Sequence, residues 1–251
     1  MRINLSIITP VYNEDKLLSK NIKNFVDFFQ KRPEIDHFEI IISENGSKDK
    51  TLAIAKKIKK KYQFIELINL NEKSLGLALS YAIKKSKYPY LYFLPIDNPF
   101  RFMDYFGSIK NINRFDIIFS TKNHPQSVYK NKPLRKVASH IFSFLVKAIF
   151  HLPLTDTQGT FFAKREKLLS LLHYSTSKGP FFQTQLAIYA FKKGMHIQEF
   201  PVNYTTPYRR RSKISLIKDG SMLIFELLIE KLKIMKASLT PRREHLGRYY
   251  K

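Results

Sequence analysis

Short apolar runs alternate with longer amphipathic segments along the N-terminal part of the chain. Each apolar run is bounded by turn residues, which is typical of buried strands, and each amphipathic segment has helical spacing. The predicted strands are 4–9, 38–43, 64–70 and 90–94, and the predicted helices are 15–30, 50–61 and 74–86. Strands and helices that alternate at this spacing predict βα units and a mostly parallel sheet, which is a three-layer α/β fold.

After residue 100 the alternation becomes less regular. We predict strands at 116–120, 161–163 and 196–204, helices at 134–150, 180–193 and 216–237, a polar loop at 122–133 and a basic loop at 208–213. The last helix is amphipathic and carries interspersed Lys residues. Such a helix either lies in the interface of an anionic membrane or packs on the globular domain. We therefore divide the chain into a domain at 1–215, this amphipathic helix at 216–239, and a basic tail at 240–251.

A parallel sheet binds its ligands beyond the carboxyl ends of its strands. The loops at those ends are predicted to be 10–14, 43–49, 69–76 and 95–100. A nucleotide-binding type of α/β domain holds its ligand in loops at these positions. Gly46 allows close approach of the backbone or a positive φ. The sequence therefore places a nucleotide-type site at this edge.

The charge of the chain is strongly positive, with 44 Lys and Arg against 20 Asp and Glu and a formal net charge of +24. Such a surface attracts nucleotide phosphates, nucleic acid or an anionic membrane leaflet. Lysine clusters such as 56–61 are equally explained as a solvated helix face. No nucleic-acid-binding motif accompanies the charge, so we expect no nucleic-acid partner.

Cysteine content and hydropathy limit the remaining classes. The chain has no Cys, which excludes disulfides and thiolate metal sites. No apolar stretch reaches the roughly 20 residues that a spanning helix needs, and the first apolar run is too short for a signal peptide. We expect a cytoplasmic protein that is peripheral on the membrane face, without a transmembrane helix.

Two motifs give the chain a family resemblance. Residues 8–14 read ITPVYNE and residues 44–51 read ENGSKDKT. Their order resembles the opening of family 2 glycosyltransferases, where a strand and Pro-x-Tyr-Asn-Glu precede a second strand and Asp-Asp-Gly-Ser-x-Asp-x-Thr. Residues 71–78 are similar to the next loop of that family. The resemblance implies a GT-A fold whose donor-binding residues are Pro10, Tyr12, Glu14, Glu44, Asn45, Gly46, Ser47 and Gly76.

Motifs in the second half of the chain restrict the resemblance to one branch of this family. Leu134-Arg135 with Ser139, DTQ at 156–158, and RSKIS at 211–215 look like the dolichyl-phosphate mannosyltransferase branch. This resemblance, over roughly residues 3 to 220, implies an inverting glycosyltransferase. It would move a single sugar from a nucleotide-diphosphate sugar to a polyprenyl phosphate, dolichyl or undecaprenyl, on an anionic membrane surface.

Positive charge is what this reaction needs, since it brings two phosphates together. Arg suits the task because it binds phosphate bidentately. The residues expected at the acceptor phosphate are Arg135, Ser139, Arg165, Arg211, Ser212 and Lys213. The expected catalytic residues are Asp97, Arg135, Arg211 and Lys213.

Two departures from the family pattern affect the chemistry. The metal motif Asp-x-Asp is here Pro95-Ile96-Asp97, so Asp97 is the one expected protein ligand for a divalent cation, Mg²⁺ or Mn²⁺. Gln183 and Gln185 stand where relatives carry an Asp-x-Glu pair. Gln cannot act as a general base, although an anionic phosphate acceptor needs none. The alternative is a catalytically impaired GT-A-fold protein that binds nucleotide or lipid phosphate without transferring sugar.

Overall fold

A seven-stranded sheet forms the centre of the computed structural model, which describes residues 2–97, 109, 112–130, 133–205 and 216–239. The strand order is β3-β2-β1-β4-β7-β5-β8. Its strands are β1 (Ile3–Val11), β2 (Ile35–Asn45), β3 (Ile65–Leu70), β4 (Tyr90–Phe93), β5 (Ile117–Thr121), β7 (Phe161–Lys164) and β8 (Ile197–Pro201). Within this sheet β7 pairs antiparallel with both β4 and β5, and the other pairs are parallel. A separate parallel pair joins β6 (Tyr129–Lys130) to β9 (Tyr204–Thr205).

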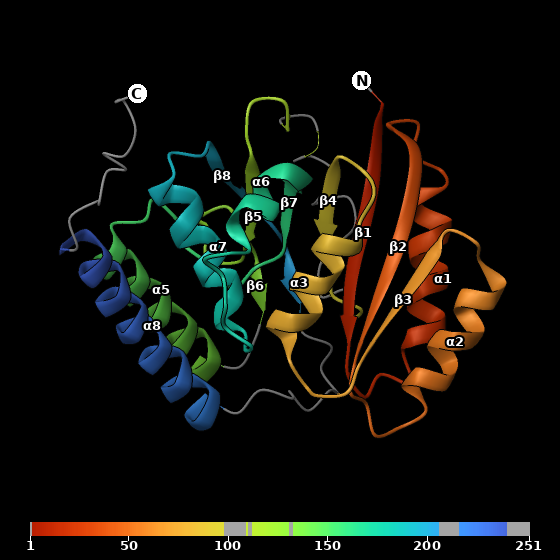
Figure 1. Cartoon of the computed structure of the whole chain (residues 1–251), viewed down its shortest axis with the longest axis horizontal. Helices are drawn as coiled ribbons and strands as arrows, with labels where there is room; N and C mark the ends of the chain where they lie inside the picture. The colour runs from red at the N-terminus through yellow and green to blue at the C-terminus, as the bar shows by residue number, and fades with distance from the viewer. Residues whose placement is uncertain (1, 98–108, 110–111, 131–132, 206–215, 240–251) are drawn as a thin grey trace, which may run out of the picture.

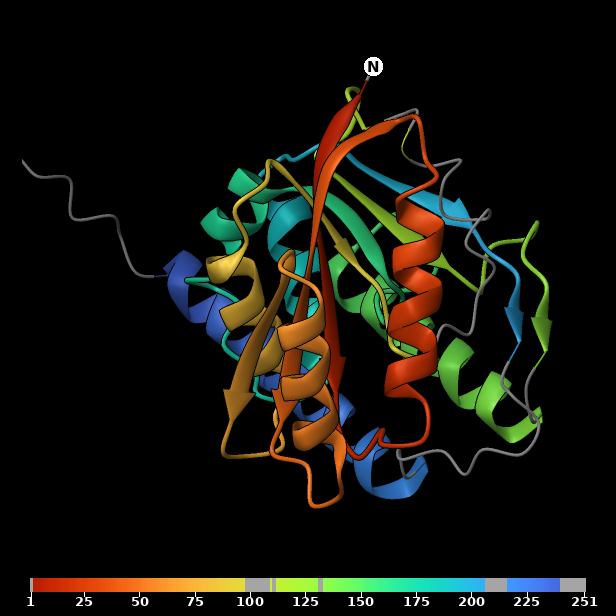
Figure 2. The same cartoon turned by 90° about the vertical axis from the view of Figure 1, so that its right-hand side faces the viewer.

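Helices cover both faces of the sheet, as Figures 1 and 2 show. Helices α1 (Leu18–Phe29) and α2 (Thr51–Lys61) pack on one face. The other face is covered by α3 (Leu75–Lys85), α6 (Arg165–Leu171) and α7 (Phe181–Lys192). These three layers, with a mostly parallel sheet, confirm the predicted fold class.

The strand sequences explain the two-sided core. In β1, Leu5 and Ile7 join the cluster that packs on α1, whereas Ile8 joins the cluster on the opposite face. In β2, Ile42 and Ile41 divide in the same way. Successive strand side chains point to opposite faces, so a strand that is covered on both sides must be apolar throughout.

The predicted elements appear within a few residues of their expected bounds. Helix α6 and strand β6 were not predicted, because each is a short segment within or beside a region assigned to another element. The expected strand at 196–204 is divided into β8 and the start of β9.

Two helices lie side by side at one end of the sheet, α5 (Pro133–Phe150) and α8 (Leu216–Leu239) (Figure 1). Their inner faces share a small apolar cluster with α7 that includes Val146, Phe181 and Leu227. Helix α8 therefore packs on the domain, which was one of the two alternatives for this segment. None of the helices in the described ranges combines the length and the apolar character that crossing a bilayer requires.

The outer faces of these two helices remain apolar and exposed. The exposed large apolar side chains are Leu134, Val137, Ile141 and Phe144 on α5, and Met222, Ile224, Phe225, Leu228, Leu232 and Met235 on α8. Most of these side chains recur at helical spacing along one face of each helix, and exposed apolar faces of this kind mark interaction sites.

Candidate active site

The carboxyl ends of β1, β2, β4 and β5 lie at one edge of the sheet, because these strands run in the same direction. Strand β7 runs the opposite way, so the loop that precedes it, residues 155–160, reaches the same edge. The loops that resemble a nucleotide site therefore lie beside the loops of the second half, as expected for an open α/β sheet.

The segment after β1 is fastened to the segment after β2. Asn13 has a positive φ of 51°. Its backbone N–H donates to Ser47 Oγ at 2.9 Å, and its Oδ1 accepts from the Lys48 N–H at 2.8 Å. The Glu14 N–H donates to Thr51 Oγ1 at 2.7 Å. The two loops thus form one unit, with Pro10 at the end of β1 and the Tyr12 ring 4.9 Å from Lys73 Nζ.

Glu44 and Asn45 are buried and shape the neighbouring loops. Glu44 Oε1 accepts from the Ser47 N–H at 2.6 Å, and Asn45 Oδ1 accepts from the Ser74 N–H at 2.6 Å. These oxygens hold the backbone that surrounds the expected donor site. Direct contact of the two residues with a nucleotide base stays a prediction.

The two glycines of the expected donor site serve close approach of the backbone. Gly46 has a φ of 67°, and a Cβ there would lie 3.0 Å from the Glu72 backbone. At Gly76 a Cβ would lie 1.9 Å from the Ser177 carbonyl oxygen. Gly46 therefore allows the turn after β2, and Gly76 allows α3 to pack against the 177–178 backbone.

Asp97 follows β4 at the same edge and is half-buried. The backbone before it is anchored, because Leu94 N–H donates to the Ile8 carbonyl and Asn21 Nδ2 donates to the Ile96 carbonyl at 2.7 Å. Among the described residues, no three His, Cys, Asp or Glu side chains gather as a ready-made metal site. A single carboxylate still suits Mg²⁺ or Mn²⁺ when phosphate oxygens complete the ligand set.

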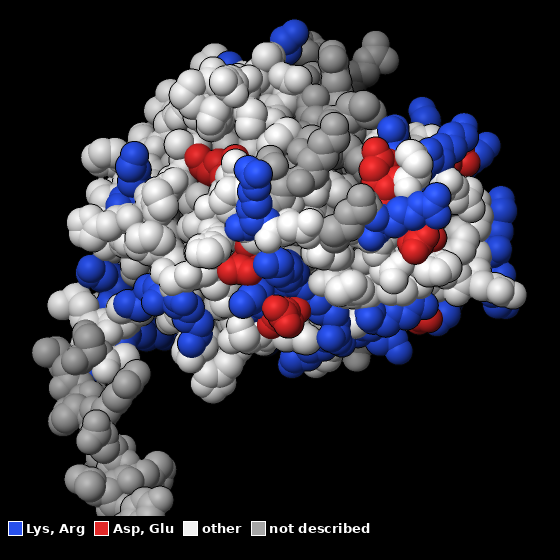
Figure 3. Space-filling model, turned by 90° about the horizontal axis from the view of Figure 1, so that it is seen from above, with Lys and Arg blue, Asp and Glu red and all other residues white. Residues whose placement is uncertain are grey.

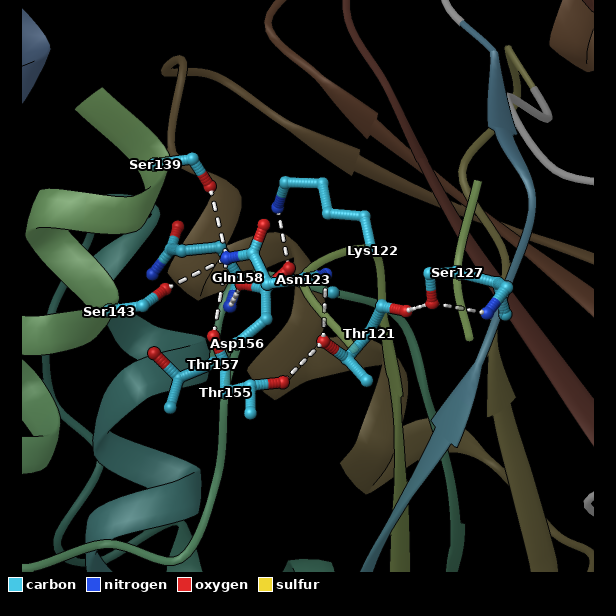
Figure 4. Close-up of polar contacts among 12 residues, drawn as sticks. Thr121, Lys122, Asn123, Ser127, Ser139, Ser143, Thr155, Asp156, Thr157 and Gln158 are labelled. Atoms are coloured by element: carbon cyan, nitrogen blue, oxygen red, sulfur yellow. Dashed lines mark hydrogen bonds and ion pairs between the residues drawn. The ribbon is translucent and has the colours of Figure 1, made fainter. Parts of the chain in front are cut away.

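A partly buried ion pair connects β5 to the loop before β7. Lys122 Nζ lies 2.5 Å from Asp156 Oδ2, with side chains 14% and 2% exposed (Figure 4). Burial disfavours the charged ammonium, but the charge and hydrogen bond of Asp156 outweigh it and raise the pKa of Lys122. Asp156, which belongs to the DTQ motif of the family resemblance, thus has a lysine as its ionic partner.

Glu199 of β8 accepts hydrogen bonds from the same loop. It accepts from the Thr155 N–H and from the Thr155 hydroxyl, and its Oε1 lies 3.1 Å from the donating Asp156 N–H. Burial raises the pKa of Glu199, and these hydrogen bonds only partly offset that shift. The loop at 155–156 is therefore held by two side chains, because Glu199 accepts from its backbone and Lys122 pairs with Asp156.

Asn123 joins β5 to α5 in the same network. Its Nδ2 donates to Ser143 Oγ at 3.1 Å, to the Thr155 carbonyl at 3.2 Å and to Ser139 Oγ at 3.5 Å (Figure 4). Arg135 lies one helical turn before Ser139, on the same side of α5. The network brings the predicted residues Arg135 and Ser139 to the edge that carries the donor loops.

The residues predicted at the acceptor phosphate also include Arg165, Arg211, Ser212 and Lys213. Arg165 donates from Nε to Ser86 Oγ at 3.1 Å, and its backbone N–H donates to the Pro89 carbonyl, at the start of β4. This is the opposite edge of the sheet, since β7 ends where β4 begins, so placing Arg165 with the other phosphate ligands was wrong. Arg211, Ser212 and Lys213 lie outside the described residues.

The two glutamines on α7 have structural partners. Gln183 Nε2 donates to the Gly159 carbonyl beside the 155–158 loop. Gln185 Nε2 donates to Glu230 Oε2 of α8 at 2.8 Å, and its Oε1 accepts from the Ser177 N–H at 2.8 Å. Both side chains are buried. The two glutamines therefore hold the 159 and 177 backbone segments in place by hydrogen bonds, a role that needs no general base.

Sequence reasoning missed Lys122, Asn123 and Glu199. Lys122 and Asn123 directly follow the predicted strand at 116–120, so the rule that ligands meet at carboxyl ends of strands would have found them. Glu199 lies inside a strand, and no sequence signal separates it from a surface residue of that strand.

Comparisons with known proteins identify a family and several relatives. The model described as "Glycosyl transferase family 2" matches residues 6–171. Dolichyl-phosphate beta-glucosyltransferase ALG5A of Trichomonas vaginalis is 27% identical over 234 residues, which cover 88% of this chain and 72% of that protein. Glycosyltransferase AglD of Haloferax volcanii is 23% identical over 221 residues, which cover 86% of this chain. The chain spans only 35% of the length of AglD.

Solved structures share the fold. Glucosyl-3-phosphoglycerate synthase from Mycobacterium tuberculosis, in complex with Mn²⁺, UDP and glucosyl-3-phosphoglycerate, is 17% identical with a TM-score of 0.66, covering 91% of this chain and 80% of that one. Mannosyl-3-phosphoglycerate synthase from Rubrobacter xylanophilus is 15% identical with a TM-score of 0.66, covering 98% and 79%. At these identities the likeness shows the fold alone.

The Lys122–Asp156 pair should stabilise the fold measurably. Asp156→Asn leaves a partly buried ammonium without its carboxylate and should lower the free energy of unfolding by about 3 kcal/mol, measured by urea denaturation. The pKa of Lys122 is raised, so the contribution is present below the ordinary lysine pKa of 10.5 and is lost as pH rises through the higher folded-state value. The difference in the free energy of unfolding between wild type and Asp156→Asn should therefore stay constant near neutral pH and become smaller at strongly alkaline pH.

The matched control is Asp36→Asn, which removes an ion pair that Arg2 makes with Asp36 on the surface. This variant should unfold like wild type, because exposed pairs contribute little. An equal effect of both substitutions would contradict the assignment of the Lys122–Asp156 pair.

Proposed function

The chain belongs to glycosyl transferase family 2, and from this premise we propose that it moves one sugar, with inversion, from a nucleotide-diphosphate sugar to a polyprenyl phosphate. The observation that carries the proposal is that the nucleotide-type loops after β1 and β2 lie at the same edge of the sheet as a polar and basic region from β5 and α5. The names of relatives such as ALG5A support the acceptor class.

The donor nucleotide would bind the unit formed by the loops after β1 and β2. Pro10 and Tyr12 provide apolar and aromatic surface for the base. Glu14 is a buried carboxylate that can accept from donors of the base or ribose. The loops are held by hydrogen bonds of their own, so the site is largely formed before the nucleotide binds.

The diphosphate would lie toward Asp97, beyond the end of β4. A divalent cation there would screen the charge of the leaving diphosphate. Asp97 would be its protein ligand.

The acceptor phosphate would lie against α5, where Arg135 and Ser139 face the Asn123 network. Arg211, Ser212 and Lys213 belong to this proposal through the family resemblance. An acceptor oxygen, already anionic, would attack the anomeric carbon while the bond from that carbon to the diphosphate breaks. No proton is removed, which fits the structural roles of Gln183 and Gln185.

A second candidate function is binding without transfer. The single carboxylate at Asp97 and the absence of a base at Gln183 and Gln185 favour it. In that case the chain would bind nucleotide or lipid phosphate and leave the sugar in place.

Transfer is tested with a panel of nucleotide sugars and a short-chain polyprenyl phosphate. We expect one donor to yield a sugar-phospholipid, and Asp97→Asn to weaken Mg²⁺- or Mn²⁺-dependent donor binding by about tenfold or more, since a direct charged ligand is lost. Asp27→Asn on α1 is the matched control and should bind the donor like wild type. Donor binding without product from any donor would support the second function. If the folded protein binds none of UDP, GDP and CDP, sugar transfer is excluded and only the lipid-phosphate form of the second function is left.

Arg135 should contribute to acceptor affinity. A charge-assisted bond to phosphate is worth about 1.5–3 kcal/mol, so Arg135→Ala should raise the acceptor KM by roughly 10- to 100-fold. The KM for the donor should stay nearly unchanged. Lys147→Ala, which removes an exposed cation from the same helix, is the control and should leave both values alone. Parallel loss of donor affinity in Arg135→Ala would argue against an acceptor role.

The acceptor is a lipid, and we propose that the exposed apolar faces of α5 and α8 lie on an anionic membrane. Helix α5 contains no Asp or Glu. Among the described α8 side chains, Glu226 and Glu230 face the domain, whereas Lys233 and Lys236 are exposed. The apolar surface is thus bordered by positive charge, which suits a bilayer with anionic headgroups and disfavours a second copy of this chain.

The distribution of charge adds a long-range attraction. Figure 3 views the molecule from the side where β1 begins, opposite the candidate site, and Lys and Arg are spread across that face as well. The positive charge is therefore not confined to the phosphate sites. It would draw the whole molecule toward an anionic leaflet, while the apolar faces decide which side touches it.

Binding to vesicles tests this orientation. Wild type should bind phosphatidylglycerol vesicles better than phosphatidylcholine vesicles, and the binding should fall as salt rises. Combining Phe144→Ser with Phe225→Ser removes two side chains that are 68% and 64% exposed. Burying a Phe contributes roughly 1.5–3 kcal/mol, so vesicle affinity should fall at least about tenfold.

Tyr81→Ser on α3, which removes a 51% exposed aromatic residue from another surface, should leave vesicle binding unchanged. A wild-type dimer that the double variant converts to monomer, with no vesicle binding by either, would show that the face pairs with a second copy instead.

A further inference from the structure

Helix α8 turns two carboxylates toward the domain. Glu230 is 2% exposed. It accepts hydrogen bonds from Gln185 Nε2 and from the Tyr189 hydroxyl, both on α7. Glu226 Oε1 accepts from Ser177 Oγ at 2.6 Å. A buried carboxylate is costly unless it is hydrogen-bonded, so these contacts define how α8 sits on the domain.

The same contacts fix the backbone of the loop before α7. Gln185 bridges two segments, because its Nε2 donates to Glu230 while its Oε1 accepts from the Ser177 N–H at 2.8 Å. Ser177 Oγ, which donates to Glu226, also accepts from the Gly179 N–H at 3.1 Å. Residues 177–179 are therefore held from the side of α8.

That loop in turn holds the start of α3. The Lys178 carbonyl accepts from Ser74 Oγ at 2.8 Å and from the Gly76 N–H at 3.0 Å. The approach is close enough that a Cβ on Gly76 would lie 1.9 Å from the Ser177 carbonyl oxygen. Ser74 N–H then donates to Asn45 Oδ1 at the end of β2. Hydrogen bonds thus run without interruption from α8 to the expected donor loop.

We propose that Glu226 is a positioning residue for the donor site, acting through the 177–179 loop and Ser74 on Asn45. The proposal rests on the proposed function, because it takes the loop at Asn45 to bind the nucleotide. Helix α8 is then part of the donor site as well as a surface for membrane contact. Loss of the Glu226 bond would remove the contact of the Ser177 hydroxyl with α8, while Gln185 still accepts from the Ser177 N–H. The 74–76 backbone would loosen, without any change at the nucleotide or the acceptor residues on α5.

The test compares Glu226→Ala and Glu226→Gln in the full-length chain. Calorimetry with UDP, GDP and CDP should show nucleotide affinity about two- to tenfold weaker in Glu226→Ala, the range expected when coupling is transmitted through packed segments. Hydrogen exchange should become faster at residues 74–77 and 177–179 and stay unchanged in β5 and β8. Glu226→Gln keeps an oxygen for Ser177 Oγ and should restore both readouts.

Asp27→Asn is the matched control, since it removes an exposed carboxylate from α1, on the opposite face of the sheet from α3 and α7. It should behave like wild type in both measurements. Unchanged exchange in Glu226→Ala, or failure of Gln to restore what Ala removes, would overturn the proposal. If wild type binds none of the three nucleotides, the proposed function fails, and the exchange result alone then decides whether Glu226 positions the loop.

Discussion

The direction of β7 determines which segments of this protein can act together. Because β7 runs antiparallel between β4 and β5, β5 keeps the direction of β1, and the loop before β7 reaches the carboxyl edge. Residues 155–158 can then pair with Lys122 and Asn123 at the end of β5. A β7 that ran in the other direction would carry that loop to the opposite edge, and Lys122 would lose Asp156 as its partner.

The same reversal explains which site residues could be predicted. The loops after β1 and β2 follow from strand order and apolar periodicity, and the structure joins them through Asn13 and Ser47 as that order implies. The fold and the family were therefore accessible from sequence, and both are confirmed. Arg165 shows the limit, because it was expected at the acceptor phosphate but the edge of the sheet at which it lies depends on the direction of β7. Sequence spacing does not report that direction for a short strand.

Helices set a second limit to prediction. Periodicity shows that α5 and α8 are amphipathic, but the apolar residues of each divide between an inner set, such as Val146 and Leu227, and an outer set, such as Phe144 and Phe225. Apolar character alone does not distinguish these sets. The polar contacts do, since Ser143 faces Asn123 and Glu230 faces Gln185. Orientation of these helices is thus decided by a few buried hydrogen bonds, whose partners lie far away in sequence.

Acidic residues are scarce in this chain, and their placement shapes its electrostatics. The sequence has 20 of them against 44 cations. Several are buried as hydrogen-bond acceptors, among them Glu39, Glu44, Asp156 and Glu230. Glu39 and Glu230 also lie within 4.0 Å of the exposed ammonium groups of Lys87 and Lys233, but 20 carboxylates cannot neutralise 44 cations, so the outer field stays positive. The few carboxylates therefore hold loops together inside the protein, and the excess of cations leaves a net positive charge that attracts phosphate groups.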